Sequence, residues 1–265
     1  MKRSCFTLIE LLVVISVIAF LIAIMIAVLQ SSKQRAKAVV CGSNIKQLTV
    51  DLFMYETDNQ SFPYGFYGTY TQPPGGYPGN FTFDKSGWWW FNYTSDYPGR
   101  NRSERTTLWC PSRQIRDPKF DHVLHGNYGV NQSICRISDD IQRNREEFVG
   151  APLRGSDIPH PGQSLLIVDS GYSIISWWHV TDDPPIPFDD NRKGEDTAYL
   201  PGLKTNKDKN LLPDQEQDAI DGRHPNKTVN VGFVDGHVAR TKADNLCVEK
   251  TAEVYTNKIP LWLPR

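Results

Sequence analysis

The strongest feature of the hydropathy pattern is an unbroken apolar segment close to the amino terminus. From Leu11 to Leu29 there are 19 residues, and Ser16 is the only polar one among them. A helix rises about 1.5 Å per residue, so this segment is long enough to cross the roughly 30 Å of hydrocarbon in a bilayer. The pattern therefore predicts a single membrane-spanning helix, which we assign to residues 6–30.

Beyond this segment the pattern becomes amphipathic with a helical period. Apolar residues recur at intervals of four, three, four and three, at Cys41, Ile45, Leu48, Leu52 and Tyr55. This spacing is typical of a helix face that packs on a domain, and Asp51 is expected on the solvated side. Residues 31–60 are therefore predicted to continue the first helix as far as the turn before Pro63, with bends at Gly42 or the Ser31-Ser32 pair.

Residues 61–265 are numerous enough for one globular domain of the α+β class, although two small domains stay open as an alternative. The apolar run from Ser164 to Asp169 is bounded by turn residues and predicts a buried strand. Apolar residues alternate with polar or small ones between positions 229 and 233, which is typical of a half-buried strand. The dipeptide Asp235-Gly236 then predicts a two-residue hairpin turn.

Residues 62–97 differ in composition from the rest of the chain. They contain 14 of its 30 aromatic residues and ten Gly or Pro residues, so regular structure is not expected to persist. The run Trp88-Trp89-Trp90 allows two interpretations, a loop that packs its own aromatic side chains or a surface that binds sugars. Packing is favoured, because aromatic side chains dominate small cores.

Glu10 interrupts the apolar character of the predicted span. An ionised carboxylate in hydrocarbon costs on the order of 2.5–3.5 kcal/mol, so it needs a partner and indicates a function. The sequence Cys5-Phe6-Thr7-Leu8-Ile9-Glu10-Leu11 resembles the processing site of type IV prepilins and type II secretion pseudopilins. The resemblance implies that a prepilin peptidase removes the leader, residues 1–5, by cutting between Cys5 and Phe6, and then methylates the new amino terminus of Phe6.

The fifth residue of the mature protein is a glutamate in these families, and the resemblance gives this position to Glu10. Its carboxylate would neutralise the Phe6 ammonium of a neighbouring subunit, and so set the register of subunits in a filament. Cys5 departs from the family pattern, which usually has glycine before the cleaved bond. Slower or variant processing is therefore expected.

The same resemblance implies a fold, a location and partners. Pilin-like proteins place a long amino-terminal helix before a small antiparallel β-sheet, in agreement with the α+β class. The chain is expected to cross the inner membrane once, with residues 61–265 in the periplasm. It would then enter an extracytoplasmic filament with copies of itself and companion pseudopilins. A type IV pilus and a type II secretion filament both fit, and the layout slightly favours secretion. The alternative is a single-pass membrane-anchored protein whose aromatic loops bind carbohydrate.

Shorter motifs resemble a prepilin-like family of planctomycete and lentisphaera-type bacteria. They are the segments Leu108–Ser112 and Asn127–Asn131 and a carboxy-terminal His-x10-Asp-Gly motif made by His224, Asp235 and Gly236. That family has nine residues between the His and the Asp. The additional residue is expected in the turn Pro225–Thr228, where it leaves the strand register intact.

Four cysteines remain once the leader is removed, namely Cys41, Cys110, Cys135 and Cys247. An even number in an exported domain favours two disulfides, for which four cysteines allow three connectivities. We favour Cys41–Cys110 with Cys135–Cys247, and buried free thiols are the alternative.

Charge and motifs argue against other classes of protein. The net charge of −1 gives no large basic field for nucleic acid. The sequence has no nucleophile elbow, P-loop, dinucleotide fingerprint or zincin helix, so neither an enzyme nor a bound cofactor is expected. His224, Asp235 and His237 are interpreted as structural residues rather than as a metal or acid–base site.

Calcium is the one ion that the acidic loops could attract, because it prefers carboxylate and other oxygen ligands. The spacing matches no EF-hand, so these residues are only weak candidates. They are Asp182, Asp183, Asp189, Asp190 and Asn191 in one predicted loop, and Asp214, Glu216, Asp218 and Asp221 in another.

Overall fold

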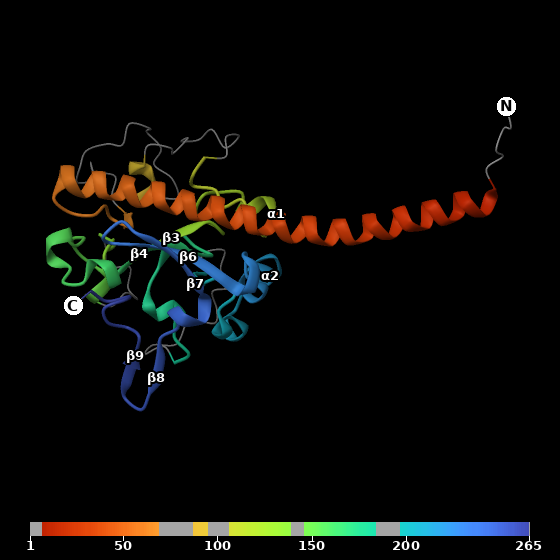
Figure 1. The fold of residues 1–265 in the computed structure, drawn as a ribbon. Coiled ribbons are helices and arrows are strands. Elements are labelled where there is room, and N and C mark those ends of the chain that lie inside the picture. The colour runs from red at the N-terminus through yellow and green to blue at the C-terminus, as the bar shows by residue number, and fades with distance from the viewer. Residues whose placement is uncertain (1–6, 69–86, 95–105, 139–145, 184–196, 265) are drawn as a thin grey trace.

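The computed structural model describes residues 7–68, 87–94, 106–138, 146–183 and 197–264. Its longest element is the helix α1, Leu8–Asn59. The amino-terminal half of α1 projects away from the globular body, and its other half lies across the β-sheet (Figure 1). The predicted α+β arrangement, a long first helix on a small sheet with long loops, is confirmed.

Helix α1 is continuous through both positions where the sequence predicts a bend. Ser31, Ser32 and Gly42 all lie within the helix, which curves only gently (Figure 1). It ends at Asn59, where Gln60 adopts a left-handed conformation with φ of 60°. A single rod therefore connects the apolar segment to the domain.

The predicted apolar stripe of α1 is confirmed, with one addition. Cys41, Ile45, Leu48 and Leu52 are at most 1% exposed. Asp51 is also buried, although its position in the pattern places it on the solvated side. It accepts a hydrogen bond from the Gln47 side chain one turn earlier, at 3.1 Å, which gives the buried carboxylate a partner.

The main sheet has five strands in the order β5-β3-β4-β6-β7. They are β3 (Tyr128–Asn131), β4 (Leu165–Asp169), β5 (Ile174–Ile175), β6 (Thr228–Phe233) and β7 (Val238–Lys242). Their pairings are antiparallel except for β3 with β5, which is parallel, so the predicted antiparallel sheet is in fact mixed. The predicted strand at 164–169 is confirmed as β4, which is buried over its whole length.

Smaller elements complete the described part of the chain. They are the pair β1 (Phe66–Tyr67) and β2 (Trp88–Trp89), the pair β8 (Glu249–Thr251) and β9 (Val254–Thr256), and the helix α2 (Pro213–Asp221). The run Trp88-Trp89-Trp90 is at most 5% exposed, so these rings belong to the core. This confirms the packing interpretation for the described part of the aromatic segment; residues 69–86 and 95–97 lie outside it.

Strand β6 is buried on both faces rather than half-buried. Val229 and Val231 enter a hydrophobic cluster on the face of the sheet away from α1. Asn230 and Gly232 face α1, because the Asn230 side chain contacts the Ala38 carbonyl and Gly232 lies against Thr49. The alternating pattern therefore marks the two faces correctly, but the face with Asn230 and Gly232 is covered by the helix.

The hairpin between β6 and β7 is confirmed, with a different turn. Its register pairs Gly232 with Val238, and the Phe233 N–H bonds to the His237 carbonyl at 3.0 Å. The loop thus spans three residues, 234–236, and Gly236 alone has positive φ, at 88°. The predicted two-residue turn with positive φ at both Asp235 and Gly236 is wrong, because Asp235 keeps an ordinary conformation.

Gly232 allows α1 to approach the sheet closely, which leads to a first prediction. A Cβ atom at this position would lie 2.4 Å from Thr49 Oγ1 and 2.8 Å from Ile167 Cγ2. Gly232→Ala is therefore expected to lower the free energy of unfolding by about 1–3 kcal/mol through overpacking. Urea unfolding measures the loss, and Thr49→Ala in the same chain should recover part of it. If the loss of stability in Gly232→Ala is the same with and without Thr49→Ala, the clash is not with Thr49.

Candidate functional site

The amino-terminal end of α1 is organised by Thr7 and Glu10. The Glu10 carboxylate accepts hydrogen bonds from the Thr7 N–H at 2.9 Å and from the Thr7 hydroxyl at 2.8 Å. In return, Thr7 Oγ1 accepts the Glu10 N–H at 3.3 Å. This reciprocal arrangement is a capping box, which satisfies two N–H groups that the first turn of a helix leaves free. Residues Cys5 and Phe6, where cleavage is predicted, lie outside the described residues.

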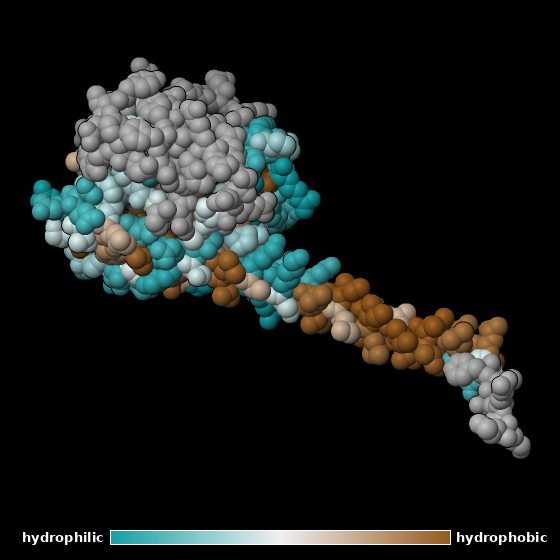
Figure 2. Space-filling model, turned by 90° about the horizontal axis from the view of Figure 1, so that it is seen from above, coloured by the Kyte–Doolittle hydropathy of each residue, from teal (hydrophilic) through white to brown (hydrophobic). Residues whose placement is uncertain are grey.

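The shaft that follows is an exposed apolar surface. Its large hydrophobic residues from Leu11 to Leu29 are each between 46% and 70% exposed, and Figure 2 shows the shaft as a continuous hydrophobic surface. Among the described residues, α1 is the one helix whose length and composition allow it to cross a membrane. Soluble monomers rarely expose such a large apolar area, so this surface requires lipid or other helices around it.

The match with a known family falls on this part of the chain. Residues 2–26 match the family model described as the prokaryotic N-terminal methylation motif. Comparisons with curated proteins and with solved structures find no match. The match covers 25 of the 265 residues and shows the motif itself. Together with the apolar helix α1, it is consistent with a prepilin-type amino terminus and a single-pass membrane anchor.

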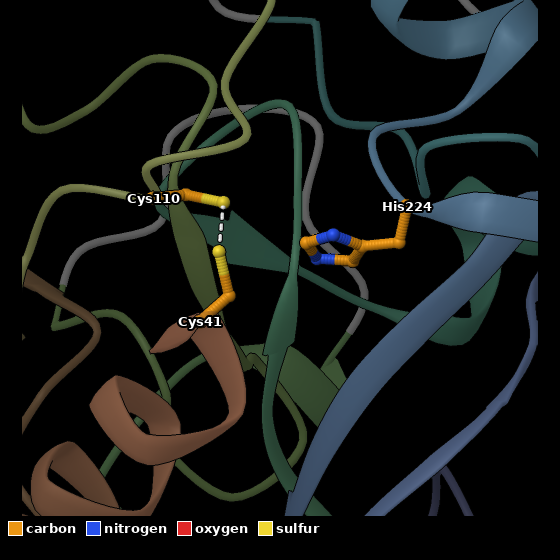
Figure 3. A group of neighbouring side chains, drawn as sticks. All are labelled: Cys41, Cys110 and His224. Carbon is orange, nitrogen blue, oxygen red and sulfur yellow. Dashed lines mark hydrogen bonds between the residues drawn. The ribbon is translucent and has the colours of Figure 1, made fainter. Parts of the chain in front are cut away.

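A second group of candidate residues lies where α1 meets the domain. Cys41 from α1, Cys110 from the loop before β3 and His224 from the segment before β6 converge in the interior (Figure 3). Their ligand atoms lie within 4.8 Å of one another, and the three residues are buried. The cysteine sulfurs are 2.7 Å apart. The sequence analysis favours Cys41 with Cys110 as a pair, but no local spacing predicts that His224 lies beside them.

Asp169 anchors this group from the end of β4. Its Oδ2 atom accepts hydrogen bonds from the Asn230 N–H at 2.7 Å and from His224 Nε2 at 3.1 Å. The Asn230 side-chain amide also donates to it, at 3.1 Å. The sequence left the role of Asp169 open between a backbone amide, a metal and no role, and the structure gives it the backbone amide of Asn230.

Electrostatics in this group favour a charged His224. Burial opposes the charge, but the adjacent Asp169 carboxylate attracts it and raises the pKa of His224 to about 9. The pKa of Asp169 is lowered: burial acts against ionisation, and His224 outweighs it. A protonated His224 and an ionised Asp169 therefore form a buried ion pair.

The shift of the His224 pKa leads to a second prediction. The pair stabilises the fold fully below pH 6.5 and loses this contribution as the pH rises towards 9, because the unfolded histidine has already lost its proton. Between pH 6 and 9, wild-type protein should lose on the order of 2–3 kcal/mol more than His224→Gln, which keeps a donor near Asp169 but does not titrate. Urea unfolding at both pH values measures this difference.

Wild type must be compared with His224→Gln, because Lys209 also titrates between pH 6 and 9. Burial lowers the pKa of Lys209 to about 7, which acts in the opposite direction, but equally in both proteins. Equal pH dependence of wild type and His224→Gln would contradict the ion pair.

The His-x10-Asp-Gly motif is divided between two places. His224 is buried next to Asp169, whereas Asp235 lies at the exposed tip of the β6–β7 hairpin. There Asp235 accepts hydrogen bonds from the His237 N–H at 3.0 Å and from His237 Nδ1 at 2.6 Å. The Lys46 ammonium of α1 donates to the Gly236 carbonyl at 2.6 Å. The motif therefore fixes the hairpin at two points. His224 connects its start to the core, and Gly236 connects its tip to α1.

Two of the four carboxylates of the second predicted calcium loop, Asp214 and Asp218, have partners within the protein. This segment is the helix α2 rather than a loop. Asp214 accepts the backbone N–H groups of Arg116 and Asp117, and Asp218 forms a buried ion pair with Arg223 at 2.7 Å. In the first predicted loop, Asp182 and Asp183 contact Lys250, and residues 189–191 lie outside the described part of the chain.

The four cysteines are free in this structure. Cys41 and Cys110 are brought together, as expected. Cys135 belongs to the hydrophobic cluster between α1 and the sheet, and Cys247 to the cluster on the opposite face. The structure therefore does not form the Cys135–Cys247 pair, because the sheet separates the two thiols.

Proposed function

We propose that this chain is a structural subunit of a type IV pilus-like or type II secretion filament, made as a precursor and cut by prepilin peptidase before Phe6. The observation that carries the proposal is the N-terminal methylation motif on a helix whose apolar shaft is exposed. In the precursor the shaft is anchored in the inner membrane with the domain in the periplasm. In the filament, the shafts of neighbouring copies and companion subunits replace the lipid.

The role of Glu10 in this proposal follows from its position at the start of the shaft. Cleavage before Phe6 leaves a new ammonium group on Phe6, directly before the capping box and four positions before Glu10. Within a bundle of shafts the dielectric constant is low, so a carboxylate from one subunit attracts the ammonium of the next strongly. The capping box also orients the Glu10 carboxylate at the helix terminus, where this partner arrives.

The alternative, a membrane-anchored carbohydrate-binding protein, finds no support in the described part of the aromatic segment. Sugar binding needs an exposed aromatic face, and Trp88, Trp89 and Trp90 are buried. The Trp90 indole N–H is also taken up by Ser173.

The mass of the mature amino-terminal peptide is the test of the proposal. Full-length protein isolated from the membrane of the producing cell should begin with N-methyl-Phe6. A Cys5→Gly variant restores the usual family residue and should be processed faster, whereas a bulky residue at the same position should block the cut. An intact Met1 in all mature protein would overturn the filament role.

A further inference from the structure

Cys41 and Cys110 join parts of the chain that are far apart in sequence. Cys41 lies on the sheet-facing stripe of α1, and Cys110 lies 69 positions later in the loop before β3. Their sulfur atoms are 2.7 Å apart and point toward each other (Figure 3). Both residues are buried, at 0% and 4% exposure. A contact this close between two thiols at the interface of helix and domain needs a chemical explanation.

A metal ion is the first explanation to test against the geometry. His224 Nδ1 has no hydrogen-bond partner among the described residues, as a ligand atom would require. Tetrahedral zinc, however, binds each thiolate at about 2.3 Å, which holds two ligand sulfurs roughly 3.8 Å apart. Structural zinc also takes four protein ligands, and the described residues offer three in this group. The sulfur atoms are too close for this coordination and approach the separation of a covalent pair, about 2.05 Å.

We propose that Cys41 and Cys110 form a disulfide that fixes α1 to the globular domain. The proposal rests on the proposed function in one respect, because that function places the domain outside the cytoplasm, where disulfides persist. The bond closes a long loop of the chain and joins the shaft directly to the segment before β3. Pulling on the shaft then acts on the domain through a covalent bond as well as through packing.

The reaction is a thiol–disulfide exchange with an extracytoplasmic dithiol oxidoreductase in its disulfide form. The Cys41 thiolate attacks one sulfur of that disulfide, and a mixed disulfide forms while the second sulfur of the donor leaves as a thiolate. Cys110 then gives up its proton and attacks the Cys41 sulfur, so that the Cys41–Cys110 bond forms and the donor leaves fully reduced. Two thiols are oxidised and one disulfide is reduced. Because both sulfurs end up buried, the exchange precedes the final seating of α1.

The surroundings of the pair favour Cys41 as the attacking thiol. The groups that face it are Cys110, His224 and Asp169. A hydrogen bond with Cys110 and the charge of His224 lower the pKa of Cys41, whereas burial raises the pKa of Cys110. Since the thiolate is the reactive form, Cys41 is the more reactive of the two thiols once α1 lies against the domain.

Thiol mapping of the full-length protein is the deciding experiment. Protein purified from membranes is unfolded in urea with N-ethylmaleimide present, so that buried free thiols also react. It is then digested without reduction, and its peptides are analysed by mass spectrometry. We expect Cys135 and Cys247 to carry the label and Cys41 and Cys110 to appear in one linked peptide. Label on both Cys41 and Cys110 would overturn the disulfide, and stoichiometric zinc in the same sample would assign the site to a metal instead.

The same digest separates this proposal from the proposed function. Its amino-terminal peptide reports cleavage before Phe6 independently of the thiols. A cleaved terminus with labelled Cys41 and Cys110 leaves the filament role intact and refutes the disulfide. A linked Cys41–Cys110 peptide together with an intact Met1 supports the disulfide and refutes the filament role.

Melting with and without dithiothreitol gives a second readout in detergent. Wild-type protein and the matched control Cys135→Ser, which loses a different buried thiol, should both melt about 10 °C lower after reduction. Cys110→Ser should melt lower from the start and be insensitive to the reductant. If Cys110→Ser does not fold, wild type and Cys135→Ser still decide the question. Equal melting temperatures with and without reductant in these two proteins contradict the bond.

Discussion

Asp218→Asn is expected to lower the free energy of unfolding by about 3–5 kcal/mol, the range for breaking a fully buried ion pair. The Asp218 carboxylate accepts two hydrogen bonds from Arg223 Nε, at 2.8 and 2.9 Å, and one from Nη2, at 2.7 Å. The Tyr199 hydroxyl donates to the same carboxylate at 2.9 Å. Neither side chain of the ion pair is exposed, so removal of the negative charge leaves the guanidinium buried without compensation.

The effect is large because Arg223 also connects separate parts of the fold. Its Nη1 and Nη2 atoms donate to the backbone carbonyls of Asn127 and Ser170, each at 2.7 Å. These carbonyls lie directly before β3 and directly after β4, so the ion pair fixes α2 to the ends of these two strands, near His224. Loss of Asp218 is therefore expected to loosen the support of the buried cysteine–histidine group as well.

Asp221→Asn is the matched control for this prediction. It makes the same chemical change in the same helix, but Asp221 is exposed at the end of α2. Its effect should remain within about 0.5 kcal/mol, as for surface substitutions in general. Urea unfolding of the three proteins at pH 7 gives the comparison, and similar losses in the two variants would contradict a special role of the Asp218–Arg223 pair.

The second large effect is expected at Glu10. Glu10→Gln should reduce incorporation into filaments at least about tenfold, a factor that corresponds to only 1.4 kcal/mol of lost attraction. Glutamine removes the charge but can still act as the third residue of a capping box with Thr7. The variant therefore tests the attraction between subunits while the helix end stays capped. Glu10→Val would remove both the charge and the cap.

Two controls accompany the Glu10 experiment. Ser16→Val changes the other polar residue of this region, which bonds only to the Val13 carbonyl of its own helix at 2.7 Å, and should assemble normally. Peptide mass should show cleavage before Phe6 in Glu10→Gln, because the new amine is needed for the comparison. Filament yield measured against membrane-bound protein gives the result, and wild-type yield for Glu10→Gln would refute the charge pairing between subunits.

The parts of the fold that follow from local pattern could be predicted from the sequence. The apolar segment has the length and composition of a membrane-spanning helix, and the stripe from Cys41 to Leu52 has a helical period, so a long first helix could be predicted. The bends expected at Ser31-Ser32 or Gly42 do not occur. Strand β4 is apolar throughout and bounded by turn residues, so it was also predictable. The Cys41–Cys110 pair is the one that the sequence analysis favours among three connectivities. Its position beside His224 was not predicted.

The remaining features depend on contacts between distant residues. Gly232 looks like the solvated face of β6 until α1 is known to cover it. The acidic segment at 213–221 carries local helix signals, because Pro213 stands at its first position, acidic residues follow in the first turn and Gly222 comes after its end, so its helix could have been predicted. The burial of Asp218 against Arg223, and the contact of Asp214 with another loop, could not. His224 meets Asp169 only because β4 and β6 are neighbours in the sheet. The spacing of residues along the chain does not predict these long-range contacts.

The uninterrupted course of α1 also determines how far the domain stands from the lipid. The first buried residue, Ala38, follows the last apolar residue of the shaft, Leu29, by nine positions, which is about 13 Å of helix. The headgroup layer on one side of a bilayer is only roughly 5–8 Å thick. Lys33, Arg35 and Lys37 fall within this interval, where their charges meet phosphates and water. In the proposed precursor, the globular part is thus held clear of the membrane surface, and a subunit that leaves the bilayer for the proposed filament withdraws only its shaft.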